Sequence, residues 1–519
     1  MTDKSLSHIE NISTVCDTVR TCLGPLGTNK MVLKEDGGVK TSTSGSKILE
    51  ELELTDPSFR LLEQTTSDFA SRHGDGSTTV ATLLSALLSE AASLLEKGLH
   101  PTVIENGYRE ALEIAANEIS LRERPLEDVG VEAVVKTALT ETRDPNVRAT
   151  VADSVGTAIQ TVADSSSSTR NHRQVKVVPR LGGALSETEL VRGVVLDTNP
   201  VTRSMPRRLD EAQIVLLSTT VDLPHLSTET STEGERTIAV DSVEDRIALG
   251  EAERDSFKQQ LNHAIDAGCS AMITTRAIND RVTQLLANNG ILGLSQIDEA
   301  DIARIARATG TTVVPSLKEI DTSRLGTGTI RIQRHAGRDM TFVESESGDP
   351  VFTLFVRAPD PRSIETFQQS VEHSIRAGLS AKDSGTVVPG GGAIEMSAVQ
   401  SIQERSHSIS GPAQLAVEAF GDALSAIPQT LAMNSGLDRH SSLARLYVSH
   451  SEGRDTAGIN ATRGVVDNVM ETGPIVDPPK LKQAAWTAAT DLSTKLIRID
   501  DRIVATNLEP DQSEQQEEV

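Results

Sequence analysis

The sequence predicts a multidomain α+β protein in which an α/β part is inserted between two mainly helical parts. The chain has 519 residues, which is too long for one ordinary domain. Apolar residues recur at helical spacing near both ends of the chain, whereas short β-type runs alternate with helical patterns in its middle. Aromatic residues make up only 2% of the chain, so its cores must be built from Leu, Ile, Val and Ala.

The N-terminal part is expected to be helical. From Ile9 to Leu23 apolar residues recur at helical spacing, and Gly24 with Pro25 should stop that helix. A second amphipathic helix is expected to begin at Ser77, because one apolar stripe runs from Val80 to Leu95. These two helices predict the core of the first helical part.

The middle of the chain, from about Leu190 to Val356, is expected to be α/β. Its β-type runs RGVVLD, QIVLLST, SAMITT and TTVVPSL alternate with helical patterns at Ile278 to Asn289 and Glu299 to Thr309. This alternation is typical of βαβ units. The polar stretch from Ser227 to Arg236 should form a loop.

A second helix-rich block is expected from about Gly411 to Ala505. The segment LEPDQSEQQEEV that follows is acidic and polar, which predicts a disordered tail. The three cysteines have neither CxxC spacing nor a nearby histidine pair, so they are expected to be buried thiols rather than zinc ligands or a disulfide framework; they are Cys16, Cys22 and Cys269.

Charge and hydropathy limit the possible partners. The formal charge of −24 disfavours binding to nucleic acid or to anionic lipid. No run of about twenty apolar residues and no leader is seen, so we expect a soluble cytoplasmic protein without a membrane partner. The excess of carboxylates, with more arginine than lysine, is typical of a halophilic host, whose salt screens such charge.

The motif GDGSTT, from Gly74 to Thr79, is the strongest chemical signal. It stands at the start of the apolar helix, where free N–H groups and the helix dipole attract a phosphate. Asp75 adds a carboxylate of the kind that a phosphate-bound Mg²⁺ takes as ligand. An ordinary glycine turn with Ser and Thr capping would give the same pattern, so the motif alone leaves both interpretations open.

In this context the chain resembles the group II chaperonins, the family of the archaeal thermosome and of the eukaryotic cytosolic chaperonin. The resemblance is carried, in the same order along nearly the whole chain, by the segments VRTCLGPLGTNKM, GDGSTTVATLL, HPTVIENGYREAL, ELVRGVVLD, TVVPGGGAIE, AGIN, IVDPPKLK and LIRIDD. It implies subunits that assemble into two stacked rings, bind ATP and Mg²⁺, and grip unfolded polypeptides.

The resemblance also implies a division into domains. An equatorial domain would consist of residues 1–125 and 385–507, and an intermediate hinge domain of residues 126–195 and 350–384. An apical domain would span residues 196–349, with a helical protrusion at about 225–261 that acts as a lid. Apolar spots on the protrusion would come from Val243, Ile247, Phe257 and Leu261. Residues 508–519 would be the tail.

Motif matching then assigns the nucleotide site. Asp75 would bind Mg²⁺. Residues matching the family's nucleotide contacts are Leu23, Gly24, Pro25, Gly45, Gly76, Ser77, Thr78 and Thr79, with Gly391 and Asp477 at the adenosine end.

Two expected catalytic aspartates are replaced in this chain. Ser44 stands where the family has an aspartate needed for hydrolysis, and His373 stands at the second aspartate position. Loss of both carboxylates would slow phosphoryl transfer, which depends on positioning and electrostatics. Lys47 stands next to the phosphates, where it would either bind a phosphate as a point charge or point into solvent.

Two further departures concern coupling. The nucleotide-sensing turn, which in the family contains a lysine, reads Glu141 to Arg143, and the glycine-rich hinge after an apical strand reads Arg357, Ala358, Pro359. An Ala-Pro pair in place of two glycines restricts the backbone, so this hinge should bend less readily.

Three functional hypotheses follow from the resemblance and the departures. The first is a subunit that binds Mg-ATP and unfolded protein but hydrolyses slowly, in a mixed ring with competent paralogous subunits. The second is an ordinary ATPase chaperonin in which His373 or an unrecognised carboxylate, for instance Asp36, replaces the lost aspartates. The third is a scaffold or ligand-binding protein that has kept only the fold.

Overall fold

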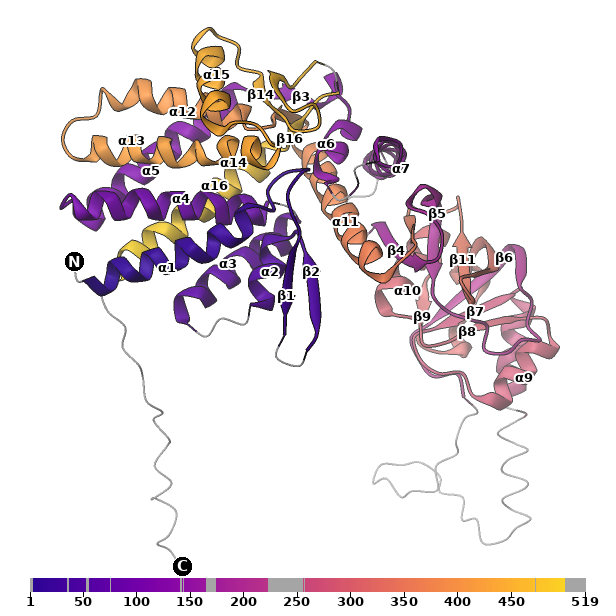
Figure 1. Ribbon diagram of the computed structural model, residues 1–519. Coiled ribbons are helices and arrows are strands. Elements are labelled where there is room, and N and C mark those ends of the chain that lie inside the picture. Colours follow the sequence, from indigo (N-terminus) through magenta and orange to yellow (C-terminus); the bar gives the residue numbers. More distant parts are fainter. Residues whose placement is uncertain are drawn as a thin grey trace, which may run out of the picture. The chain divides into compact units, whose positions relative to one another are not determined.

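The computed structural model (Figure 1) consists of two compact units. The helical unit comprises Met1–Thr140 with Asp383–Val519, and the sheet unit comprises Glu141–Lys382. The structure describes residues 3–34, 37–52, 56–74, 76–140, 142, 144–164, 174–222, 255, 257–471 and 473–499. The expected loop at Ser227 to Arg236, most of the expected protrusion, and the acidic tail lie outside these residues.

The helical unit is built from both ends of the chain. Its helices are α1 (Asp3–Arg20), α2 (Gly45–Glu51), α3 (Pro57–His73), α4 (Ser77–Glu96), α5 (Pro101–Leu121), α6 (Val131–Ala138), α12 (Ala393–Ser406), α13 (Ala413–Leu424), α14 (Ala426–Asn434), α15 (Arg439–Ser451) and α16 (Pro479–Ile497). Its strands are β1 (Lys30–Leu33), β2 (Val39–Ser42), β3 (Arg124–Pro125), β13 (Thr386–Pro389), β14 (Ala457–Asn460), β15 (Val465–Asn468) and β16 (Val476–Asp477). The last helix, α16, packs against α4 and α5, which joins the two sequence halves in one core (Figure 1).

The helix α4 is the centre of this core. It begins at Ser77, as predicted, and every residue of the predicted stripe is buried. Its length and hydropathy would also allow it to cross a membrane, but 61% of its most apolar window is buried within the protein. Its apolar character is therefore that of a core helix. The first helix, α1, ends at Arg20 rather than at Leu23, because the chain turns before Gly24.

The C-terminal block is mostly helical, as predicted, but it also contains a hairpin that helical periodicity did not indicate. Strands β14 and β15 pair antiparallel, with Ala457 opposite Asn468. Two more small sheets are found among the described residues of this unit: β1 pairs with β2, and β13 lies between β3 and β16. Cys16 and Cys22 are buried in this unit and Cys269 is buried in the other, so the prediction of buried thiols is confirmed.

The sheet unit contains a mixed sheet. Its elements are α7 (Pro145–Asp164), β4 (Val175–Leu181), β5 (Glu189–Leu196), β6 (Arg208–Leu217), β7 (Ala271–Thr274), α9 (Asp280–Asn288), β8 (Leu292–Leu294), α10 (Glu299–Thr309), β9 (Val313–Val314), β10 (Gly326–His335), β11 (Arg338–Glu344), β12 (Phe352–Ala358) and α11 (Pro361–Ser384), which continues into the helical unit. The strand order is β4-β12-β5-β11-β10-β6-β7-β8, and β9 also pairs with β6.

The βαβ prediction is right for one end of this sheet and wrong for its middle. Strands β6, β7, β8 and β9 pair parallel and carry α9 and α10 between them, as expected. Strands β5, β11 and β10 pair antiparallel, and β10 also pairs antiparallel with β6. The long β10–β11 hairpin turns at Ala336 and Gly337, a short connection of the kind that antiparallel strands allow.

Two residues of the predicted protrusion have a different role from the expected one. Phe257 and Leu261 lie in a helical stretch over 257–266, and their side chains are only 1% and 2% exposed. Both belong to the core that packs on β6 and β7. They are core residues, so the prediction that they supply exposed apolar spots is wrong; Val243 and Ile247 lie outside the described residues.

Candidate functional site

The start of α4 is the centre of the predicted nucleotide site. Gly76 is the N-cap of this helix and has a left-handed backbone with φ of 91°. A Cβ at this position would also lie 3.1 Å from the ring of Phe69, so the turn requires glycine. The amides of the first helical turn have no partner within the helix, and the helix dipole makes this end attractive to a phosphate. Asp75, the expected Mg²⁺ ligand, lies outside the described residues.

The start of α2 lies directly against the start of α4. The Gly45 amide donates to Oγ1 of Thr78 at 3.1 Å, and the Ser46 amide donates to Oγ of Ser77 at 3.3 Å. A Cβ on Gly45 would lie 3.0 Å from Oγ1 of Thr78, so glycine permits this close approach. Because both hydroxyls accept amide hydrogens, each keeps its own hydrogen available for an acceptor such as a phosphate oxygen.

Ser44 occupies the N-cap position of α2, beside these contacts. Its side chain makes no capping hydrogen bond and instead lies 3.1 Å from the hydroxyl of Ser46. The position therefore adjoins the predicted phosphate site and supplies a neutral hydroxyl there. Lys47 lies on the exposed side of α2, which agrees with the solvent-facing alternative.

Helix α14 brings two other predicted segments together. The amide nitrogen Nδ2 of Asn434 donates to the carbonyl of Leu23 at 2.9 Å, which fixes the start of the Leu23–Pro25 loop. The same helix contacts Gly392, the N-cap of α12, through Pro428. The GGG loop that precedes α12 is also tied to β14, because the Ile459 amide donates to the carbonyl of Gly391 at 2.7 Å.

Asp477 lies at the other side of the GGG loop. It is on β16, opposite Val388 of β13, and the Gly390 amide donates to the carbonyl of Ile475 at 2.9 Å. The carboxylate lies so close to Gly390 that a Cβ there would be 3.0 Å from Oδ2. The structure therefore places Asp477 beside the loop that contains Gly391, as both assignments to the adenosine end require.

The first turns of α16 connect these segments. Leu481 lies against Gly76: a Cβ added to Gly76 would lie 3.5 Å from Cδ1 of Leu481. Lys482, which follows it, binds Oε1 of Glu395 at 2.8 Å and Oδ2 of Asp477 at 3.0 Å. Burial alone would lower the pKa of the Lys482 ammonium, but the two carboxylates outweigh burial and raise its pKa. Sequence analysis missed Lys482 and Glu395, although both stand inside the quoted motifs IVDPPKLK and TVVPGGGAIE.

Within the helical unit, contacts thus link the predicted segments in a continuous series. They run from α2 to α4, from α4 to α16, from α16 to Asp477 and the GGG loop, and from that loop through α14 to the Leu23–Pro25 loop. This arrangement fits a nucleotide, because it combines a helix start, free hydroxyls and glycines that allow close approach. The individual contacts to ATP and Mg²⁺ stay predictions.

Most of the remaining predicted positions belong to the sheet unit. His373 is half-buried on α11, whereas Ile364, Phe367 and Val371 of the same helix are buried. Its role as a water-orienting base stays a prediction. Glu141 and Arg143 lie outside the described residues, as does Asp36 in the helical unit.

The altered hinge connects β12 to α11. Nε of Arg357 donates to the carbonyl of Gly182 at 2.7 Å, and Ala358 is the last residue paired with β4. Asp360 caps α11, since its Oδ1 accepts the amide hydrogen of Ser363 at 3.0 Å. The connection is short and hydrogen-bonded at both ends.

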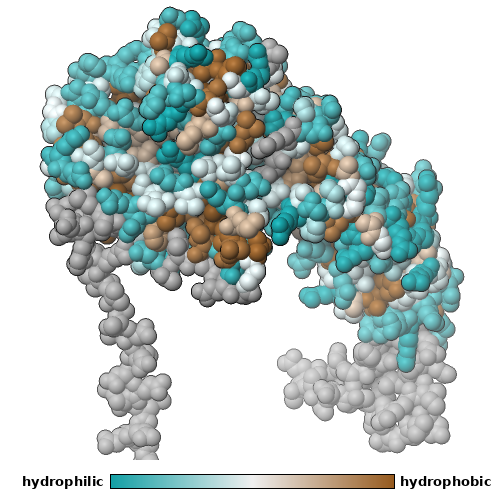
Figure 2. Space-filling view, in the orientation of Figure 1, coloured by the Kyte–Doolittle hydropathy of each residue, from teal (hydrophilic) through white to brown (hydrophobic). Residues whose placement is uncertain are grey.

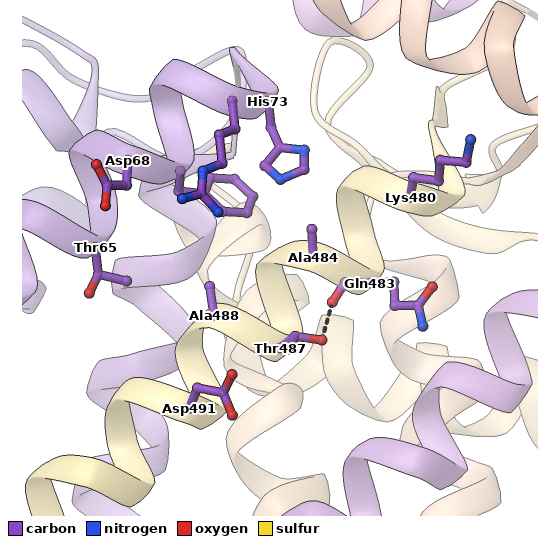
Figure 3. Close-up of a pocket in the computed structure, with 11 residues that line it drawn as sticks. Thr65, Asp68, His73, Lys480, Gln483, Ala484, Thr487, Ala488 and Asp491 are labelled. Carbon is purple, nitrogen blue, oxygen red and sulfur yellow. Dashed lines mark hydrogen bonds between the residues drawn. The ribbon is translucent and has the colours of Figure 1, made fainter.

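A groove of about 550 Å³ lies between α3 and α16 (Figure 3). Its lining residues are Thr65, Asp68, Phe69, Arg72, His73, Lys480, Gln483, Ala484, Thr487, Ala488 and Asp491. None of them is a predicted nucleotide contact. Phe69 separates the groove from Gly76, whose Cβ would lie 3.1 Å from the ring, so the groove is distinct from the predicted phosphate site.

Comparison with known proteins agrees with this arrangement. The model of the TCP-1/cpn60 chaperonin family matches residues 15–507. The chain is 33% identical to a thermosome subunit of Methanopyrus kandleri over 512 residues, which cover 98% of this chain and 93% of that protein. It is 34% identical to thermosome subunit 3 of Haloferax volcanii, over 96% of this chain and 95% of that protein.

A third relative is a thermosome subunit of another organism. Thermosome subunit alpha of Halobacterium salinarum is 32% identical over 499 residues, or 95% of this chain and 87% of that protein. The names of these relatives distinguish more than one kind of thermosome subunit. Because the family match spans nearly the whole chain and agrees with the motifs and the two-unit fold, this chain belongs to the TCP-1/cpn60 chaperonin family as a subunit of the group II type.

Proposed function

We propose that this chain is a subunit of a ring-forming chaperonin that assists protein folding, binds Mg-ATP and hydrolyses it slowly. One observation carries the proposal. Ser44 lies beside the hydrogen bonds that join α2 to α4, where a neutral hydroxyl replaces the expected carboxylate, while the glycines and hydroxyls suited to phosphate are in place. The site therefore has groups suited to binding phosphate but lacks, at position 44, the carboxylate expected for hydrolysis.

In this proposal the start of α4 binds the phosphates. Gly45, Gly76 and the hydroxyls of Ser77, Thr78 and Thr79 lie along the phosphate chain. Mg²⁺, held by Asp75, would neutralise charge on the phosphate oxygens. The Leu23–Pro25 loop, which α14 holds through a hydrogen bond, contacts the nucleotide. Gly391 and Asp477 lie at the adenosine end.

Slow hydrolysis follows from what the reaction requires. Phosphoryl transfer depends on a group that orients the attacking water and on charge that stabilises the transition state. A serine hydroxyl at position 44 supplies no charge, and His373 supplies an imidazole in place of a carboxylate. We infer a rate lower by several orders of magnitude than that of a subunit with both aspartates.

We also propose that the subunit works in a mixed cytoplasmic ring and binds unfolded polypeptides. Figure 2 shows an apolar patch over the β1–β2 hairpin, where Met31 is 62% exposed, Leu33 73% and Val39 39%. An exposed apolar hairpin that pairs with no other described strand supports contact with a neighbouring subunit. Relatives with distinct subunit names support paralogous partners.

The test is single-turnover ATP hydrolysis in high salt by the wild type and by the double variant Ser44→Asp/His373→Asp. We expect bound but nearly unhydrolysed ATP in the wild type and a large gain of rate in the variant. Adding Asp75→Ala to the double variant should abolish the gain. Rapid turnover by the wild type that the variant does not improve would show a working ATPase with another water-positioning group. Failure to form rings or to bind unfolded protein would favour the scaffold hypothesis.

A further inference from the structure

Lys482 forms a buried ion cluster with Glu395 and Asp477, at a helix position that is unfavourable for a cation. Lys482 is the fourth residue of α16, where the positive end of the helix dipole disfavours a cation. Its side chain is only 12% exposed, and that of its partner Glu395 is 0% exposed. Burying such charges costs more than it returns unless geometry and hydrogen bonds are good. A well-packed apolar pair would serve the fold at least as well, so stability alone gives a weak reason for this cluster.

The cluster is also incompletely satisfied. Oε2 of Glu395 is buried and has no hydrogen-bond partner among the described residues. Lys482 divides its hydrogen bonds between Oε1 of this carboxylate, on α12, and Oδ2 of Asp477, on β16. Glu395 therefore anchors the lysine from within the core, and the lysine reaches outward to a carboxylate that is 21% exposed.

The position of Asp477 indicates a functional role for Lys482 and its partner Glu395. Oδ2 is held by Lys482 on one side and lies against Gly390 on the other, so the carboxylate cannot turn freely. Lys482 binds Oδ2, and no hydrogen bond to Oδ1 is found among the described residues, so Oδ1 can act as an acceptor. A nucleoside presents hydroxyl and amine donors to such an acceptor.

We propose that Lys482 is a positioning residue of the nucleotide site, which fixes Asp477 as an acceptor for the nucleoside and joins the GGG loop to the first turn of α16. This inference rests on the proposed function, since it assumes that ADP or ATP binds beside Asp477. It predicts that Lys482 governs recognition of the nucleoside and not of the phosphates, which lie at the start of α4.

The experiment measures the affinities of Mg-ADP and Mg-pyrophosphate by calorimetry for the full chain. Because Lys482→Met alone leaves Glu395 as an unpaired buried charge and can unfold the protein, the main variant is Lys482→Met/Glu395→Gln. We expect its ADP affinity to fall about tenfold, as for loss of a charged hydrogen bond, with pyrophosphate affinity unchanged. In the Asp477→Asn background the same double change should have no further effect, because Lys482 acts through Asp477.

A matched control is Lys176→Met in the sheet unit. Lys176 binds Oδ2 of Asp301 at 2.6 Å and its side chain is 19% exposed, so it is a similarly shielded lysine outside the site. Its variant should leave both affinities unchanged. Equal losses of ADP and pyrophosphate affinity, or a full effect in the Asp477→Asn background, would overturn the positioning role. Wild-type protein that binds neither ligand would overturn the proposed function and this inference together, whereas wild-type binding with an unaffected variant would overturn the inference alone.

Discussion

The helical unit and the sheet unit differ in the share of the predicted machinery that each contains. The helical unit keeps the predicted binding segments packed in a continuous series from α2 to α14. The sheet unit contains His373 and the Arg357–Pro359 hinge, two of the positions where the chain departs from its family. The predicted binding segments therefore all lie in the helical unit, together with Ser44, whereas the second altered catalytic position and the altered hinge lie in the sheet unit.

The prediction with the largest expected effect tests whether nucleotide binding depends on the helical unit alone. Each unit has a buried aromatic pair: Phe420 with Tyr108, at 5.7 Å between ring centroids, and Phe342 with Phe355, at 5.8 Å. Phe420→Ala and Phe342→Ala should each lower the free energy of unfolding by about 3–5 kcal/mol, because each leaves a cavity in a packed core. Unfolding followed in denaturant measures both losses.

The two variants should differ in nucleotide binding. At temperatures where both remain folded, Phe420→Ala should weaken Mg-ADP binding, because Phe420 packs under α4 and α5. Phe342→Ala should bind Mg-ADP as the wild type does. Equal loss of affinity in both variants would contradict the assignment of the site to the helical unit.

The intermediate expected effect concerns the hinge in the sheet unit. Replacing Ala358 and Pro359 by glycines should lower the free energy of unfolding by about 1–2 kcal/mol, because glycine enlarges the freedom of the unfolded chain. Hydrogen exchange should become faster at the start of α11, from Arg362 to Ile364. Ala336→Gly in the β10–β11 turn is the control, since Ala336 already has a positive φ of 47° that glycine adopts without strain. Unchanged exchange near α11 would show that the Ala-Pro pair does not stiffen the hinge.

The contrast between the two units also explains which parts of the fold could be predicted from the sequence. In the helical unit one apolar stripe and a glycine-rich turn determine where α4 begins and which face it buries, so both were predicted correctly. In the sheet unit the direction of a strand depends on its partners, some of which are distant in sequence. Strand β5 pairs with β11 and β12, and no local pattern distinguishes such antiparallel strands from the parallel strands β6 to β8.

The candidate site shows a similar limit. The residues that we expect to contact the nucleotide stand in short motifs with glycines, and the motifs indicated them. Lys482 and Glu395 lie 87 positions apart, and only the folded structure shows that they bind each other. Their role could not be predicted, because an isolated lysine or glutamate at helical spacing is usually a solvated surface residue.

The smallest expected effect is the pH dependence contributed by His450 in the helical unit. This side chain is 5% exposed; its Nε2 donates to the carbonyl of Ala457 at 2.9 Å, and its Nδ1 lies 3.2 Å from the hydroxyl of Ser397. Burial lowers its pKa from the ordinary value of 6.5, because it disfavours the charged form. The unfolded chain therefore binds a proton more readily than the folded protein does.

Linkage fixes the sign of this effect. The contribution of His450 to stability is fully present above about pH 6.5 and is lost as the pH falls below that value toward the lower folded-state pKa. Each unit by which the two pKa values differ is worth about 1.4 kcal/mol, so one imidazole gives a modest slope. In His450→Gln the free energy of unfolding of the helical unit should fall less steeply between pH 7 and pH 5 than in the wild type. The exposed residue His440, replaced in the same way, is the control and should leave the slope unchanged. If His450→Gln also keeps the wild-type slope, the acid sensitivity of the unit arises from its carboxylates, and the hydrogen bonds of His450 tolerate protonation because Ser397 can accept from Nδ1.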